Sequence, residues 1–284
     1  MRTFKLASID IRLGGIYKKR YLVLILLCGF YGYVFQTYMQ NLDSVLGIRD
    51  YSMGDLVAFV HCGTIPGIRM LRQRTYEISY IWLTLVMLQL LLPLDYPANA
   101  MENWGYPYAV SSSRRQWWIA KCVYTMAVNL IGAFLETASF MASCLASGTD
   151  VSLVCHSQVA EVVFGSANLS LSGTLSTGQT VYLLLIAPTL GIMAMSMVLL
   201  LLSVKFGRVT AYVLGTAWII ASIFINHPLL PGNCTMAIRS SLIDAEGISP
   251  GVQTASCFGI MAAAVLLGIL MIRRKDFFRM AVEE

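Results

Sequence analysis

Charge is scarce in this chain: Asp, Glu, Lys and Arg make up 12% of its 284 residues. Soluble domains average about 25% charged residues, which keep the exterior hydrated around an apolar core. The composition therefore excludes an ordinary soluble domain. No stretch is polar and basic enough to build a nucleic-acid-binding face, so we expect no nucleic-acid partner.

The motifs of phosphate and metal chemistry are also missing. A phosphate-binding loop needs the pattern G-x-x-x-x-G-K-S/T, and no Gly in this chain is followed by Lys. The three His residues are scattered and lack the H-E-x-x-H pattern of a zinc site. We expect this chain to be no enzyme, with no catalytic residue, no metal site and no bound cofactor.

The cysteines do not follow the pattern of a disulfide framework. Four of the seven lie in or beside apolar runs, where thiols pack as small apolar groups. The other three lie in segments where a disulfide could form: Cys62, Cys155 and Cys234. Three thiols cannot all pair with one another, and the sequence leaves the choice open.

Long apolar runs are abundant, since hydrophobic residues make up 57% of the chain. A bilayer core is crossed by roughly 20 helical residues, and most of the runs reach that length. They are too long for barrel strands, so helices must satisfy the backbone hydrogen bonds in lipid. We predict an all-α polytopic membrane protein that forms a single domain over residues 1–284. The six predicted crossings are residues 21–39, 79–94, 118–145, 180–203, 209–225 and 254–272.

The positions of Lys and Arg predict the orientation of these helices. If both termini are cytoplasmic, all but five of the 20 basic residues lie on the inner side. Membrane insertion retains basic loops inside, so we expect cytoplasmic termini in a multi-pass protein of the plasma membrane, the cytoplasmic membrane of a bacterium.

The predicted connections differ greatly in length. A tight inner turn at 204–208 joins crossings four and five, whereas the outer segments are 40–78, 146–179 and 226–253. The outer segments contain apolar stretches that could lie along the interface or dip back into protein-lined space. The most apolar stretches are residues 56–71 and 159–171.

The longer inner loop, residues 95–117, predicts a short helix from Tyr96 to Trp104. Asp95 is suited to cap its first amides, Pro97 to its first turn, and Gly105 to its left-handed exit. Its apolar and aromatic side chains are unusual for a hydrated loop. They rest on the lipid headgroups or fit a groove on a cytoplasmic partner, and the residue types alone leave both alternatives open.

A basic pair and a Trp pair follow this loop and predict a membrane anchor, with cations on phosphates and indoles at the boundary. The anchor residues are Arg114, Arg115, Trp117, Trp118 and Lys121. At this point the chain resembles the type-2 permease subunits of ATP-binding cassette (ABC) exporters, of the bacterial peptide-export and antibiotic-immunity kind. The resemblance covers nearly the whole length. It rests on the basic N-terminal segment, on Ile81-Trp82-Leu83 with Asp95-Tyr96-Pro97, on the Ser-Arg-Arg-x-Trp-Trp-x-x-Lys run and on Arg273-Arg274-Lys275-Asp276-Phe277.

The resemblance implies a division of labour. The chain would form the export path with a second permease subunit, identical or homologous, while two separate ATPase subunits would hold ATP and Mg. Residues 3–16 would be an elbow helix on the inner leaflet, and residues 225–253 would be re-entrant or outer helices. The segment LSTGQ at 175–179 is close to the LSGGQ stretch of cassette ATPases, but we interpret it as a helix start capped by Ser176 or Thr177.

The same resemblance implies that the inner loop couples the permease to its ATPase. The expected coupling residues are Tyr96, Met101, Glu102, Trp104 and Tyr106. The cargo would be a peptide or a hydrophobic compound. Two other classes remain: an ion-coupled secondary transporter, and a membrane scaffold without transport. The chain shows one midplane acid and no inverted repeat, which disfavours the secondary transporter.

Glu136 is that acid, near the middle of the third crossing. A charge at this depth is costly and generally faces protein or water, so it either lines a cavity or makes a structural hydrogen bond. Asn129 lies seven residues earlier on nearly the same helical face. We expect both residues to line one track.

Small residues four positions apart recur on three crossings and predict close helix packing. The pairs are Ala187 with Gly191, Ala211 with Gly215, and Ala264 with Gly268.

Overall fold

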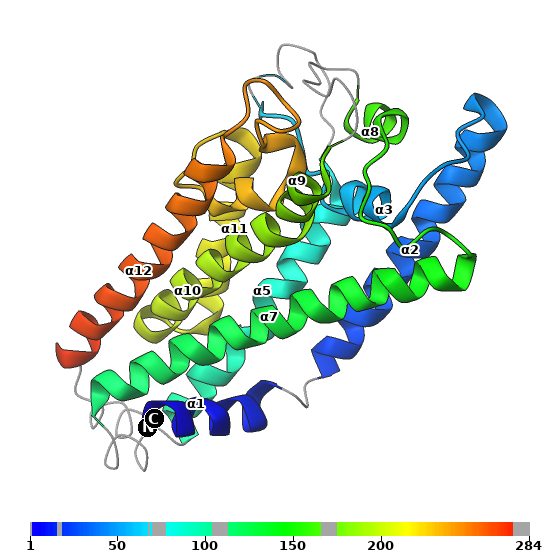
Figure 1. The fold of residues 1–284 in the computed structure, drawn as a ribbon. Helices are drawn as coiled ribbons and strands as arrows, with labels where there is room; N and C mark the ends of the chain where they lie inside the picture. Colours follow the sequence, from blue (N-terminus) through cyan, green and yellow to red (C-terminus); the bar gives the residue numbers. More distant parts are fainter. Residues whose placement is uncertain are drawn as a thin grey trace.

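The computed structural model describes residues 2–15, 19–67, 69, 78–103, 113–165 and 175–274. Within these ranges the regular structure is helical and no strand is present, which confirms the all-α prediction (Figure 1). Each predicted apolar run falls within one helical segment, except that Ser79 and Ile225 lie one residue outside theirs. These segments are α2 (Lys19–Leu46), α5 (Tyr80–Asn103), α7 (Arg114–Ser147), α9–η2–α10 (Thr177–Phe206), α11 (Arg208–Phe224) and α12 (Pro250–Arg274).

Four of these segments are long and apolar enough to cross a membrane: α2, α7, Thr177–Phe206 and α12. The protein is therefore membrane-embedded. The other two helices contribute shorter apolar stretches, Tyr80–Leu94 and Arg208–Phe224. Six crossings with cytoplasmic termini stay a prediction.

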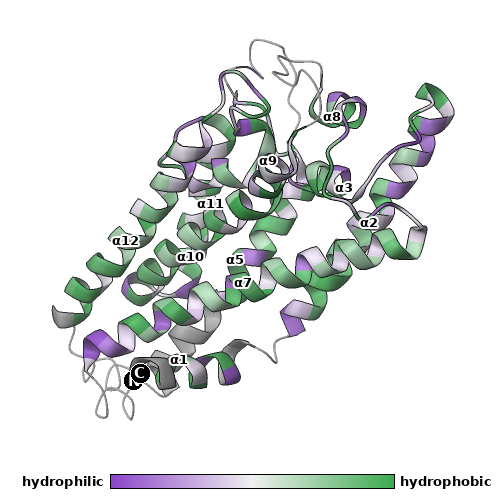
Figure 2. Ribbon diagram, viewed as in Figure 1, coloured by the Kyte–Doolittle hydropathy of each residue, from purple (hydrophilic) through white to green (hydrophobic). Residues whose placement is uncertain are grey.

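Helix α10 (Ala187–Phe206) lies at the centre of the bundle and contacts α5, α7, α11 and α12. Of the 18 most apolar consecutive residues in Thr177–Phe206, which contains α10, 72% are buried. The corresponding share for α12 is 28%. Apolar residues also cover the outer faces of the peripheral helices (Figure 2). Such faces are suited to lipid, because only a bilayer or another protein covers them.

Glycines allow the close contacts of the central helix. A Cβ atom on Gly191 would lie 2.7 Å from the carbonyl oxygen of Pro231, and one on Gly215 would collide with Leu199. Gly268 of α12 faces the indole of Trp118 in the same way. Larger residues at these positions would push the helices apart. Gly207, with a φ of 86°, is the single residue between α10 and α11, so the predicted tight turn is confirmed.

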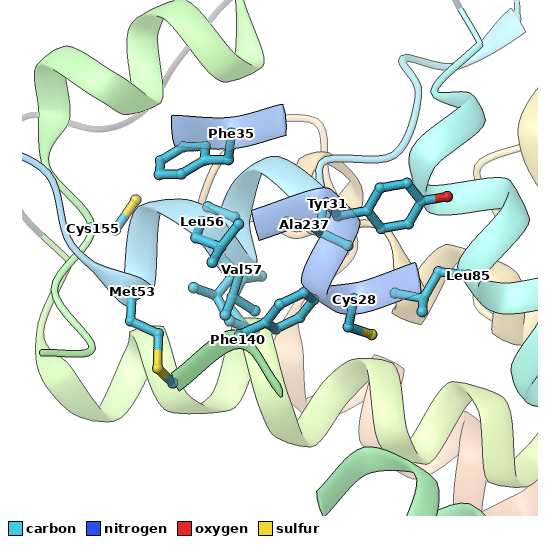
Figure 3. Packing of buried hydrophobic residues seen from close by; sticks show 14 of the residues in the cluster. Cys28, Tyr31, Phe35, Met53, Leu56, Val57, Leu85, Phe140, Cys155 and Ala237 are labelled. Carbon is cyan, nitrogen blue, oxygen red and sulfur yellow. The ribbon is translucent and has the colours of Figure 1, made fainter. Parts of the chain in front are cut away.

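The segments predicted to lie outside contain two short helices, α3 (Met53–Val60) and α8 (Ser157–Phe164). Of the two placements that the sequence leaves open for the first, the structure adopts the protein-lined one. Seven of the eight residues of α3 are buried, and Leu56 and Val57 pack among side chains of α2 and α7 (Figure 3). Ser52 and Asp55 form a capping box that starts this helix.

The segment between α11 and α12 differs from the expected helices at 225–253. It forms two short 3₁₀ turns, η3 (Pro231–Thr235) and η4 (Ala237–Arg239), whose residues are all buried. Pro231 and Gly232 disfavour a regular α-helix here. The turn η3 packs instead on α10, where Gly191 provides the space.

The elbow expected at 3–16 is helical over its described part. Helix α1 (Arg2–Asp10) continues into one π-helical turn, η1 (Ile11–Gly15), and packs against α7. Helix α1 and the last turns of α12 lie at the same end of the bundle (Figure 1). Whether this end is cytoplasmic stays a prediction.

The inner loop differs from its prediction. No new helix begins at Tyr96, because α5 runs without interruption through Asp95 and Pro97 to Asn103. Proline within a membrane helix costs one backbone hydrogen bond, which neighbouring groups replace, so a cap-like sequence does not force a helix to end. Trp104 and Tyr106 lie outside the described residues.

Candidate functional site

A cavity of about 540 Å³ lies between α3, α5, α7, η2 (Tyr182–Ile186) and α10, with one residue from α12. Most of its wall is apolar. The apolar wall includes Val57, Leu92, Phe134, Phe140, Leu184, Met193 and Phe258. Four buried polar residues interrupt this surface: His61, Gln89, Asn129 and Glu136.

Three of these polar residues form one hydrogen-bonded cluster around Glu136. The carboxylate oxygen Oε1 lies 2.7 Å from Nε2 of His61. The amide Nε2 of Gln89 donates to the second oxygen, Oε2. Glu136 is 6% exposed, so the cluster is almost closed from solvent. A buried carboxylate needs such partners, because an unpaired charge in an apolar site costs several kcal/mol.

Each residue of the cluster comes from a different helix. Glu136 and Asn129 are two turns apart on α7, about 10 Å along its axis. Gln89 projects from the middle of α5. His61 is the C-cap residue of α3, and its carbonyl accepts a hydrogen bond of 2.8 Å from the amide of Ala237. The inserted helix α3 therefore delivers the imidazole to the carboxylate.

Within the described part of the chain, three polar atoms on the cavity residues have no hydrogen-bond partner. They are Nδ1 of His61, Oε1 of Gln89 and Nδ2 of Asn129. The other side-chain atom of Asn129, Oδ1, accepts a bond of 3.4 Å from the hydroxyl of Ser196. A buried polar atom without a partner costs about 1–3 kcal/mol. The cluster is thus incompletely satisfied, unlike most buried polar groups in proteins.

The cavity opens toward the apolar outer surface of the bundle. Four of its wall residues are exposed, and all are apolar: Leu130, Phe134, Ile186 and Phe258. They come from α7, η2 and α12. In a membrane-embedded protein this mouth faces lipid or another membrane protein, so a hydrophobic molecule can reach the cavity without passing through water.

A π-helical turn, η2, forms part of the wall beside this mouth. Pro188 has no amide hydrogen, so the carbonyl of Leu184, four residues earlier, loses its usual helical donor. The hydroxyl of Thr189 donates to the carbonyl of Leu185, at 2.6 Å. Single π turns inside helices are frequent at functional sites.

The structure brings Asn129 and Glu136 to the wall of one cavity. It corrects the anchor interpretation for Trp117, Trp118 and Lys121, which are buried at 4%, 0% and 3% exposure. These residues do not reach lipid, because α1 and α12 cover this face of α7.

Their contacts are with protein. The ammonium of Lys121 lies 2.7 Å from Asp10 of α1 and 5.5 Å from the ring of Trp117. The indole of Trp118 donates to the carbonyl of Val265, at 3.0 Å. Arg115 is exposed and Arg114 half-buried at the start of α7, where Ser113 caps the helix.

Of the expected coupling residues, Tyr96, Met101 and Glu102 lie on the continuous helix α5. Their role in coupling stays a prediction. Ser176 caps α9 (Thr177–Val181) as the sequence predicts, and Gln179 completes a capping box with it.

Sequence reasoning missed His61 and Gln89. Gln89 had a detectable signal, since it is a polar residue within the second predicted crossing, where polar side chains generally face protein. His61 had none, because its place beside Glu136 depends on the insertion of α3.

The cysteines are free in the structure. Cys62, Cys155 and Cys234 do not pair with one another. The nearest thiol contact is instead between Cys234 and Cys257 of α12, whose sulfur atoms are 3.4 Å apart.

A second carboxylate–histidine pair lies at the start of α3, outside the cavity. Nδ1 of His156 lies 2.6 Å from Oδ2 of Asp55, and the amide of His156 donates to Oδ1 at 2.8 Å. The amide of Ser52 donates to Oδ2 at 2.9 Å. Burial raises the pKa of Asp55 above its ordinary value, and the hydrogen bonds from His156 and Ser52 oppose that change.

Comparisons with known proteins add no family to this description. The chain matches no protein-family model, and searches of curated proteins and of solved structures find no match.

Proposed function

We propose that the chain is a permease that binds a hydrophobic cargo in this cavity during its passage across the membrane. One observation carries the proposal: a cavity of about 540 Å³ among apolar helices has a buried carboxylate in its wall. Ligand sites in proteins generally have volumes of about 300–1,000 Å³. An ionisable residue among membrane helices generally marks a substrate or ion pathway.

The proposed machine is an ATP-driven ABC exporter in the cytoplasmic membrane of a bacterium. This chain is its permease subunit, paired with a second permease and with two ATPase subunits that carry ATP and Mg. The continuous helix α5 supports the proposal. It joins Gln89 in the cavity wall to Met101, about 18 Å away along one helix, so a push on its end would reach the site.

The test is the ATPase activity of the tagged protein, purified from its native membrane in mild detergent with its bound subunits. We expect the hydrophobic dye Nile red to stimulate hydrolysis. Replacing Met101 and Trp104 by Ala should retain basal hydrolysis and remove the stimulation. The matched control is Val45→Ala at the exposed end of α2. Unchanged stimulation in the Met101 and Trp104 variants would reject the coupling role.

The second candidate is a secondary transporter coupled to protons. The contact between His61 and Glu136 favours it, because paired titratable side chains in a membrane cavity are suited to carry protons. Transport by the isolated chain in liposomes, driven by a pH gradient without ATP, would support this candidate and exclude the exporter.

A further inference from the structure

The described part of the cavity wall carries an acidic side chain but no Lys or Arg to balance it. Among the described residues that line the cavity, Glu136 is the only carboxylate and none is Lys or Arg. His61 is the single basic side chain, and its Nε2 is already in contact with Glu136. The wall therefore offers a hydrophobic molecule one negative group and no fixed positive one.

Two further features add negative potential beside the carboxylate. When Nε2 of His61 carries the ring proton, Nδ1 is an acceptor, and this atom has no hydrogen-bond partner. Oε1 of Gln89 is likewise an acceptor that has no hydrogen-bond partner among the described residues. Each residue contacts the carboxylate through its Nε2 atom, so the two acceptors lie on the immediate neighbours of Glu136.

Aromatic rings complete a surface suited to a cation. Phe134, Phe140 and Phe258 line the same cavity. The face of a phenyl ring attracts a positive charge, and the attraction grows when the site excludes water. An anion would gain nothing from these rings and would be repelled by Glu136.

From this charge pattern we propose that the cavity binds a hydrophobic organic cation, which enters from the bilayer between α7, η2 and α12 and places its charge near Glu136. The inference names the cargo class of the permease and so rests on the proposed function. Apolar wall residues cover the body of the molecule, and the exposed mouth residues Leu130 and Phe134 lie on its route from lipid.

Two ions of nearly equal size and opposite charge provide the test: tetraphenylphosphonium and tetraphenylborate. Equilibrium dialysis of the radiolabelled cation against the purified full chain in a neutral detergent measures its Kd. We expect one saturable site for the cation, with no competition from the borate. Glu136→Gln should raise the Kd about tenfold or more, which corresponds to about 1.4 kcal/mol or more of lost binding energy.

Control variants separate charge from fold. Glu161 of α8 is exposed and lies outside the cavity wall, so Glu161→Gln should leave the Kd unchanged. Ala133→Trp fills the cavity and should abolish binding, whereas Ala142→Trp, exposed on the same helix, should not. These Trp variants keep the test decisive if Glu136→Gln fails to fold.

Three results would overturn the inference. The borate could bind as tightly as the cation, Glu136→Gln could bind the cation normally, or Ala133→Trp could leave binding intact. Nile red distinguishes this failure from that of the proposed function. If Ala133→Trp removes Nile red binding while the cation never binds, the cavity is a cargo site for uncharged molecules. If neither probe binds, the cargo site itself is rejected.

Discussion

Two carboxylate–histidine pairs meet at the two ends of the short helix α3, and they differ in how fully their hydrogen bonds are satisfied. At its start, Asp55 accepts from the amides of Ser52 and His156 and contacts the His156 ring. At its end, His61 contacts Glu136, but its Nδ1 has no partner. Among the described residues, no buried side-chain atom of the first pair lacks a partner, whereas Nδ1 of His61 lacks one on the cavity wall.

This difference separates a structural pair from a candidate binding pair. Asp55 joins α3 to the segment before α8, and two backbone amides depend on its carboxylate. Among the described residues, the hydrogen bonds to Glu136 come from the side chains of His61 and Gln89, which can rearrange when a ligand enters. The same residue types therefore serve different roles according to what surrounds them.

The largest expected effect is on the structural pair. Asp55→Ala leaves three donors at the start of α3 without their acceptor, so we expect the free energy of unfolding to fall by about 3 kcal/mol. Thermal melting in detergent, followed by size-exclusion chromatography, measures the loss. The control, Asp43→Ala, removes an exposed pair with Arg49 and should cost less than about 1 kcal/mol. Equal melting of the two variants would contradict a structural role for Asp55.

The cavity pair should respond in the opposite way. Glu136→Gln retains an oxygen for one donor and removes a buried charge, so we expect unfolding to change by less than about 1 kcal/mol. Binding of tetraphenylphosphonium should nevertheless fall about tenfold. Melting and dialysis on the same preparation check both. A variant that melts much earlier and still binds would reverse the assignment of the two pairs.

The two histidines give a smaller contrast. The His156 side chain is 32% exposed, so solvent replaces part of what His156→Ala removes, and we expect a loss of about 1 kcal/mol. His61→Ala should instead weaken cation binding, because Glu136 loses a partner that fixes its position. Melting and dialysis of both variants measure this contrast. Loss of cation binding in His156→Ala but not in His61→Ala would refute the role given to His61.

The smallest expected effect is the pH dependence of stability that comes from the structural pair, Asp55 and His156. Because the pKa of Asp55 is raised on folding, the folded protein binds this proton more strongly than the unfolded chain. The stability contributed by the protonated carboxyl is present at low pH and lost as pH rises from about 4 through the folded pKa. Melting temperature should therefore fall with rising pH more steeply in the wild type than in Asp55→Asn. Identical slopes would contradict the raised pKa.

The sequence predicted the helices far better than the site. Apolar length is a local property, and each of the six predicted runs lies within a helical segment or extends one residue beyond it. The ends were predicted less well: Asp95 and Pro97 resemble a helix start, yet α5 runs through both to Asn103, because such local signals do not by themselves force a helix to end.

The candidate site depends on contacts that no local pattern encodes. Glu136 and Asn129 could be found from their depth and spacing on one helix. His61 reaches Glu136 across 75 positions of sequence, through the short helix α3, whose apolar composition also fits the membrane surface. The anchor interpretation of Trp118 and Lys121 failed for the same reason, since α12 and α1 cover them.

The one-residue link at Gly207 limits how the molecule can change shape. Helices α10 and α11 are joined by a single residue, so the connection cannot lengthen. The side chain of Leu199 fills the space over Gly215. Sliding one of these helices along the other would unwind their ends, so we infer that the pair moves as a rigid unit. Under the proposed function, a cargo would therefore gain room by movement of α7, which also lines the cavity, rather than by separation of α10 from α11.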